Sequence, residues 1–121
     1  MSTNIDSLYT VRPYNQESDL PFIKATWLRG LYYGDSWFSK IPKDIFMNYY
    51  SPALDALISH VNVIITIACQ VEDPDVILGY CATSSDYQII HFVYVKAPWR
   101  KKGIARRISP NNPVSVSHMT K

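Results

Sequence analysis

Three successive segments between residues 62 and 96 carry the two-residue period and the β-branched side chains of β-strands. They constrain the fold more than any other feature of the chain. The first is Asn62–Val71, the second is Val76–Thr83 and the third is Tyr87–Lys96. Short runs of Asp, Pro and Ser, which favour turns, separate them. The sequence therefore predicts three antiparallel strands joined by tight turns.

Helical spacing of apolar residues precedes these strands. A short extended segment, Leu8–Pro13, comes first, and we expect Ser18 to cap an amphipathic helix that ends near Gly34. A second helical region contains Ser51–Pro52, a pair that suits the N-cap and first position of a new helix. The sequence therefore predicts two short helices there in place of one, about Lys43–Tyr50 and Pro52–His60.

Size and composition indicate one soluble domain. The chain has 121 residues, 47% of them hydrophobic and 18% charged. No apolar run approaches the ~20 residues that cross a bilayer, and Met1–Ser7 does not resemble a secretory signal. Cys69 and Cys81 are too few for a disulfide framework and lack metal-ligand spacing. We therefore expect a single cytoplasmic domain, residues 1–121, without a metal or a membrane partner.

Positive charge gathers at the C-terminal end of the chain, although the net charge is only +2. The last acidic residue is Asp86. The basic residues beyond it are Lys96, Arg100, Lys101, Lys102, Arg106, Arg107 and Lys121. Such a segment attracts phosphate esters, nucleic acid or an acidic membrane surface. On charge alone, a basic face that is only exposed to solvent explains the segment equally well.

The segment Arg100–Ala105 has the features of a diphosphate-binding loop. It follows the third strand and precedes a short helix, Ile104–Ile108, that Pro110 stops. Free amides at a helix start bind anions, and the small residues Gly103 and Ala105 let phosphate oxygens reach the backbone. The alternative is a solvated turn between the strand and the helix, in which Gly103 is needed only for the backbone conformation. The glycine patterns of nucleotide P-loops and dinucleotide folds are absent from the sequence.

These residues carry a family resemblance. Arg100-Lys-Lys-Gly-Ile-Ala105 matches the Arg/Gln-x-x-Gly-x-Gly/Ala motif of the GNAT superfamily of acetyl-CoA-dependent N-acetyltransferases. Val95 and Trp99 stand where that family keeps an apolar and an aromatic residue, and Ile77–Tyr80 resembles its third-strand pattern. In this pattern Gly79 marks a bulge or a close backbone approach. Parts of the helical region also resemble small GNAT-like proteins of phage genomes.

The resemblance implies an α/β fold, with a mixed, mostly antiparallel sheet flanked by helices and a shortened C-terminal part. Segment 98–113 is barely long enough for a crossover to one last strand, Val114–Ser117. The coenzyme's pyrophosphate would lie on the loop, and its pantetheine arm would pair with the preceding strand like an added strand. The implied coenzyme-binding residues are Val93, Val95, Arg100, Lys101, Lys102, Gly103, Ile104, Ala105 and Arg106. Arg107 is a further candidate for the 3′-phosphate.

Catalytic residues are less clearly marked. Where many GNAT proteins have a glutamate base on the fourth strand, this chain has Ile89, and His91, two residues on, is the best substitute. The alternative for His91 is a half-buried strand histidine with a hydrogen-bond partner. No residue matches the family's tyrosine acid. Tyr32–Phe38 is either a wall of the acceptor site or a core or dimer contact.

Three functions stay open at this stage. The first is transfer of an acetyl group from acetyl-CoA to a primary amine of a small molecule or protein. The second is a truncated, catalytically impaired relative that binds coenzyme A or a protein partner, with a homodimer as one way to complete an exposed sheet edge. The third is nucleic-acid binding through Lys96–Arg107, which is disfavoured because the basic residues surround one loop.

Overall fold

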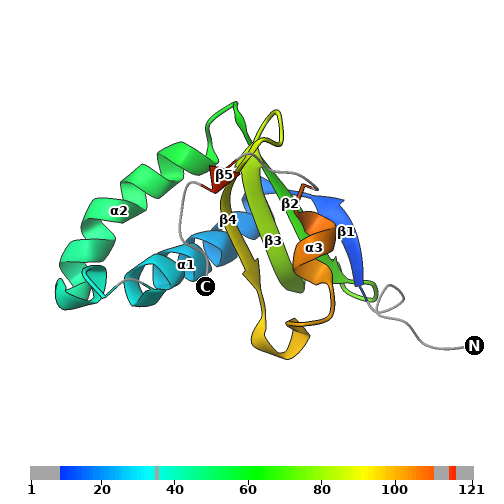
Figure 1. Cartoon of the computed structure of the whole chain (residues 1–121), viewed down its shortest axis with the longest axis horizontal. Helices are drawn as coiled ribbons and strands as arrows, with labels where there is room; N and C mark the ends of the chain where they lie inside the picture. The colour runs from blue at the N-terminus through cyan, green and yellow to red at the C-terminus, as the bar shows by residue number, and fades with distance from the viewer. Residues whose placement is uncertain (1–8, 35, 111–114, 117–121) are drawn as a thin grey trace, which may run out of the picture.

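The computed structural model describes residues 9–34, 36–110 and 115–116, with the side chains of 115–116 left out. The strands form one sheet with helices on both of its faces (Figure 1). The elements in chain order are β1 (Tyr9–Pro13), α1 (Gln16–Gly34), the short 3-10 helix η2 (Phe38–Lys40), α2 (Lys43–Ile58), β2 (Val63–Gln70), β3 (Ile77–Ser84), β4 (Ile89–Val95), the short 3-10 helix η3 (Ala97–Trp99), α3 (Ile104–Ile108) and β5 (Ser115–Val116).

The sheet confirms the predicted antiparallel strands. Its described strands lie in the order β1-β2-β3-β4-β5, and the first three pairings are antiparallel. β5 runs parallel to β4, with Ser115 opposite Ile89 and Val116 opposite Ile90. The predicted last strand therefore exists in its central two residues, while Val114 and Ser117 lie outside the described residues.

Two bulges interrupt the pairing. Ala68 faces Gly79 but Cys69 faces Ile77, so the bulge in β3 lies directly beside Gly79. A Cβ on Gly79 would stand 2.7 Å from the Tyr94 carbonyl oxygen, so both proposed reasons for this glycine hold. The second bulge, in β4, leaves His91 as the extra residue between Ile90 and Phe92.

The prediction of two short helices at residues 43–60 is wrong, because α2 is continuous through Pro52. A proline inside a helix costs about 3 kcal/mol relative to alanine. The apolar residues Phe46, Leu54 and Ile58 fall on one stripe of α2 and are buried. Each such burial contributes about 1.5–3 kcal/mol. Packing of the whole stripe therefore outweighs the proline.

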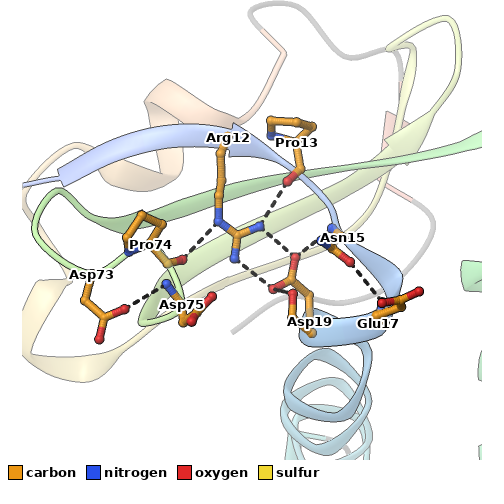
Figure 2. Close-up of polar contacts among 9 residues, drawn as sticks. Arg12, Pro13, Asn15, Glu17, Asp19, Asp73, Pro74 and Asp75 are labelled. Atoms are coloured by element: carbon orange, nitrogen blue, oxygen red, sulfur yellow. Dashed lines mark hydrogen bonds and ion pairs between the residues drawn. The ribbon is translucent and has the colours of Figure 1, made fainter.

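The predicted N-cap is also wrong, because α1 begins at Gln16 and Asn15 caps it (Figure 2). The Asn15 side-chain oxygen accepts a hydrogen bond from the Glu17 amide at 3.0 Å, which is the N-cap interaction. The Ser18 hydroxyl instead donates to Asp19 Oδ1 at 3.3 Å. A cap at Ser18 would have made Asp19 the first residue of the helix, whereas its first residue is Gln16. The predicted end of this helix at Gly34 is confirmed.

Buried side chains form one cluster on each face of the sheet. The cluster under α1 and α2 includes Trp27, which stacks on Phe92 of β4 with ring centroids 4.9 Å apart. The cluster under α3 includes Leu78 and Ile104. α1 is therefore packed firmly against β4, the strand that ends at the predicted loop. No helix of the described ranges has the length and apolar character needed to span a membrane.

Candidate active site

A cleft of about 930 Å³ lies along β4, between α1 and the segment that follows the strand. Its walls come from three parts of the chain that are distant in sequence. The lining residues of α1 are Thr26, Arg29, Gly30, Tyr33 and Gly34; those of β4 are Phe92, Val93, Tyr94 and Val95; those of the following loop and α3 are Trp99, Arg100, Lys101, Gly103, Ala105 and Arg106.

The backbone of β4 offers an open edge to this cleft. The Lys96 amide donates to the Leu78 carbonyl oxygen at 2.8 Å, so Lys96 belongs to a hydrogen-bonded pair with β3. Antiparallel pairs alternate, and the backbone groups of Val93 and Val95 therefore point away from β3. β5 pairs only with Ile89 and Ile90. Beyond these two residues no described strand pairs with this edge, and its one occupied group there is the Val95 carbonyl oxygen, which accepts a hydrogen bond from Arg100 Nε.

The loop after β4 lines the same cleft and has backbone amides without an acceptor among the described residues. Lys101 and Gly103 both have positive φ, 63° and 84°. Within the described part of the chain, the amides from Lys101 to Arg106 have no hydrogen-bond acceptor. Consecutive amides in such turns form an anion-binding concavity. A Cβ at Gly103 would meet nothing within 4 Å, so the space beside this residue is open.

Arg100 holds the loop against the strand. Its Nε donates to the Val95 carbonyl oxygen at 2.8 Å, which fixes the turn that starts at η3. The guanidinium lines the cleft and keeps its positive charge close to the free amides. Arg100 therefore has a structural and an electrostatic role in the loop.

Most residues predicted to bind the coenzyme line the cleft. The exceptions are Lys102, which is exposed, and Ile104, whose side chain is buried in the cluster under α3. Arg107, the further phosphate candidate, lies over the Tyr9 ring at 5.3 Å. Coenzyme contacts by all of these residues stay predictions.

His91 is the extra residue of the bulge in β4 and is half-buried. Burial lowers the pKa of its imidazole. His91 is not among the residues that line the cleft. The sequence alone places it on the same face of the sheet as Ile89, but the bulge breaks the alternation of side chains, so this counting does not hold. Its role as a base stays a prediction.

Sequence reasoning missed the α1 wall of the cleft at Thr26, Arg29 and Gly30. Of the predicted wall Tyr32–Phe38, only Tyr33 and Gly34 line the cleft among the described residues. A glycine inside a helical pattern was the available sign, since it costs ~1 kcal/mol relative to alanine and usually has a packing reason. A Cβ at Gly30 would lie 2.9 Å from Cζ of Phe92.

Contacts along α1 show that it runs opposite to β4. Phe22, near the helix start, packs edge-on against Tyr94 with centroids 5.9 Å apart, and Lys96 Nζ lies 5.4 Å from the Phe22 ring. One turn or more later, Gly30 contacts Phe92. The cleft therefore has a loop end, at the C-terminal end of β4, and a far end, where Arg29, Gly30 and Tyr33 approach the bulge.

A hydrogen-bonded pair of hydroxyl groups joins this wall to β3. The Thr26 hydroxyl oxygen is 2.7 Å from the Tyr80 hydroxyl oxygen, and Tyr80 donates to the Ile23 carbonyl oxygen at 3.1 Å. Burial raises the pKa of Tyr80 strongly, so this phenol stays neutral. It ties β3 to α1 and does not titrate near neutral pH.

Comparison with known proteins identifies the fold. No family model and no curated protein matches the sequence. Among solved structures, a Pyrococcus furiosus protein assigned as an acetyl transferase superimposes with a TM-score of 0.66 at 14% identity, over 93% of this chain and 81% of that chain. An aminoglycoside acetyltransferase from an uncultured soil metagenomic sample gives a TM-score of 0.53 at 17% identity, over 98% and 80%.

A third similar structure is a transcriptional regulator from Bacillus halodurans C-125, with a TM-score of 0.52 at 16% identity, over 92% of this chain and 82% of that chain. Identities this low show a shared fold alone. The chain shares its fold with solved structures that carry acetyltransferase names, and the predicted α/β fold class is confirmed.

Proposed function

We propose that this chain binds acetyl-CoA along β4 and transfers the acetyl group to a primary amine. One observation carries the proposal: the free amides of Lys101–Ala105 and the strand edge at Val93 and the Val95 amide, which no described strand pairs with, belong to one cleft. A diphosphate needs the first feature and an extended amide-containing arm needs the second. The fold adds support, because similar structures carry acetyltransferase names.

The coenzyme would lie along the cleft in a defined direction. Its pyrophosphate would accept hydrogen bonds from the loop amides, with Arg100, Lys101 and Arg106 supplying positive charge. Its pantetheine arm would then lie beside β4 as an added strand and run from the loop toward the bulge, opposite to the chain direction of β4. The thioester would arrive near the far end of the cleft, where Gly30 and Tyr33 leave room for an acceptor.

The reaction would be direct transfer. The neutral amine nitrogen attacks the thioester carbonyl carbon, the C–S bond breaks, and the products are an N-acetyl amide and coenzyme A. A proton leaves the amine nitrogen and the departing thiolate gains one. An outward-facing amide of β4 near Val93 is the group we assign to stabilise the oxyanion. His91, whose pKa is lowered by burial, is the candidate to take the proton.

A coenzyme-binding module without turnover is the second candidate function. It is favoured by one observation, namely that no carboxylate and no histidine lines the cleft among the described residues. In that case the loop would bind coenzyme A in the same way, and only the chemistry would be missing.

Titration with acetyl-CoA tests the proposal, with the wild type compared with Gly103→Glu. Two charges 4 Å apart interact by about 4 kcal/mol near a protein surface, and solvent exposure reduces this. We therefore expect at least about tenfold weaker binding. Lys40→Glu, an exposed charge change outside the cleft, is the matched control and leaves the affinity unchanged.

Equal affinity of the wild type and Gly103→Glu rejects the loop as the site. A free-thiol release assay with a panel of amines then separates the two functions. Release that depends on both acetyl-CoA and an amine supports the transferase, and binding without release supports the module.

A further inference from the structure

The far end of the cleft is positively charged. Arg29 lies on the exposed side of α1 and lines the cleft beside Gly30. Lys43 Nζ, from the first turn of α2, is held 5.5 Å from the centre of the Tyr33 ring, and Tyr33 also lines the cleft. Arg29 therefore places a cation in this end of the cleft, and Lys43, which is not a lining residue, adds positive charge beside the Tyr33 ring.

Among the described residues, no carboxylate lines the cleft. Arg29 has no ion pair with any described residue. The carboxylates that do form ion pairs with basic side chains lie elsewhere: Asp19 pairs with Arg12, and Asp55 pairs with Lys24. At the other end of the cleft, phosphates of the coenzyme would neutralise the loop cations, whereas nothing in the coenzyme's proposed course neutralises Arg29.

This charge distribution discriminates between acceptor classes. A diamine, polyamine or aminosugar antibiotic would bring several ammonium groups into a cleft already rich in cations, at a cost in Coulomb energy. An amine that also carries a carboxylate or phosphate would instead place its anion on the Arg29 guanidinium, whose planar fork binds both groups in a bidentate way. The same cations lower the pKa of a nearby ammonium group and so favour the neutral, nucleophilic amine.

We propose that the acceptor is an amine bearing an anionic group, and that Arg29 binds this anion. The proposal rests on the proposed function, since it concerns the acceptor end of the same cleft. It runs against the polycationic acceptor named for one similar structure, the aminoglycoside acetyltransferase. Carboxylate and phosphate groups would both bind Arg29 through their negative charge, and the test examines each in a separate arm.

Binding to the complex with coenzyme A tests the proposal without requiring turnover. The wild type saturated with coenzyme A is titrated with β-alanine, its neutral amide and propanediamine, and in a second arm with phosphoethanolamine and ethanolamine. We expect an anionic amine to bind about tenfold more tightly than its neutral counterpart, with the diamine weakest. The arm with the larger preference identifies carboxylate or phosphate.

Variants of Arg29 give the decisive comparison. Arg29→Glu is expected to reverse the order, so that the diamine binds more tightly than β-alanine, while Arg29→Lys keeps the wild-type order with a smaller difference. Lys40→Glu changes an exposed charge outside the cleft and keeps the order unchanged. If Arg29→Glu keeps the wild-type order, or the wild type prefers the diamine or binds none of the amines, the proposal is wrong.

Failure of the proposed function gives a different result. If the wild type does not bind coenzyme A, the first titration shows this directly, and the amine titrations are repeated on the free protein, where an anion preference that depends on Arg29 still supports the acceptor class. If Arg29→Glu loses affinity for coenzyme A itself, Arg29 belongs to the coenzyme site and the acceptor proposal is overturned.

Discussion

Arg12→Ala removes the side chain that holds the start of α1 to the sheet. The Arg12 Nη1 and Nη2 atoms donate to Asp19 Oδ2 and Oδ1 at 2.7 and 2.8 Å, and Nε donates to the Pro74 carbonyl oxygen at 3.0 Å. Figure 2 shows this side chain joining β1, the first turn of α1 and the turn between β2 and β3. Only 2% of the Asp19 side-chain surface is exposed.

The cost follows from the carboxylate that is left behind. Breaking a buried ion pair by removing one partner costs about 3–5 kcal/mol. Asp19 keeps the hydrogen bond from the Asn15 amide at 2.7 Å, so we expect the lower end of that range, about 3 kcal/mol. A domain of this size has a free energy of unfolding of about 5–15 kcal/mol, so the loss is a large part of the total.

Urea denaturation at pH 7 measures this loss. Replacing both partners, as in Arg12→Ala with Asp19→Ala, removes the buried charge and is expected to recover part of the stability. A loss below about 1 kcal/mol in Arg12→Ala, or no recovery in the double variant, would contradict the assigned role of this ion pair.

The same pair predicts the acid sensitivity of the fold. Burial opposes ionisation of Asp19, but the hydrogen bonds from Arg12 and the Asn15 amide outweigh it, and the pKa of the carboxyl lies below its ordinary value. A depressed pKa contributes stability that is complete above the unfolded value, near pH 4, and is lost as the pH falls through the folded value. Asp19→Asn should therefore reduce the stability at pH 7 and flatten its decline below pH 4.

Three other predictions test separate features. Pro52→Ala restores a backbone donor in α2 and should raise the free energy of unfolding by about 2 kcal/mol, seen as a rise in Tm; an unchanged or lower Tm would contradict the account of α2. Gly30→Val drives a side chain into Phe92 and should cost about 1–3 kcal/mol more than Ala25→Val, an exposed control on the same helix, in urea denaturation. Burial raises the pKa of Cys81 to about 11, so alkylation of the folded protein at pH 8 should be much slower than in urea; equal rates would contradict its burial.

The parts of the fold that the sequence predicts correctly depend on local patterns. The two-residue period defines β2, β3 and β4. Gly79 marks both a bulge and a close backbone contact, because any larger side chain at this position would collide with the neighbouring strand. The loop Arg100–Ala105 is recognisable because its cations, its glycine and the preceding strand are adjacent in sequence.

The errors come from long-range packing. Pro52 ends a helix by local rules, but the buried stripe of α2 carries the helix through it. The bulge at His91 has no sign in the sequence of residue types. The face of the sheet on which the His91 side chain lies therefore cannot be found by counting residues from Ile89. The Arg29 side of the cleft depends on the direction of α1 across β4, which no local motif encodes.

Amide NMR spectra during a titration with coenzyme A test the central claim most directly. With assigned ¹⁵N resonances, we predict that the largest shifts fall on Lys101–Ala105 and on Val93 and Val95, and that these amides exchange more slowly with solvent in the complex. Unmoved resonances in the loop, while another surface responds to the ligand or none does, would contradict the assignment of this turn as the diphosphate site.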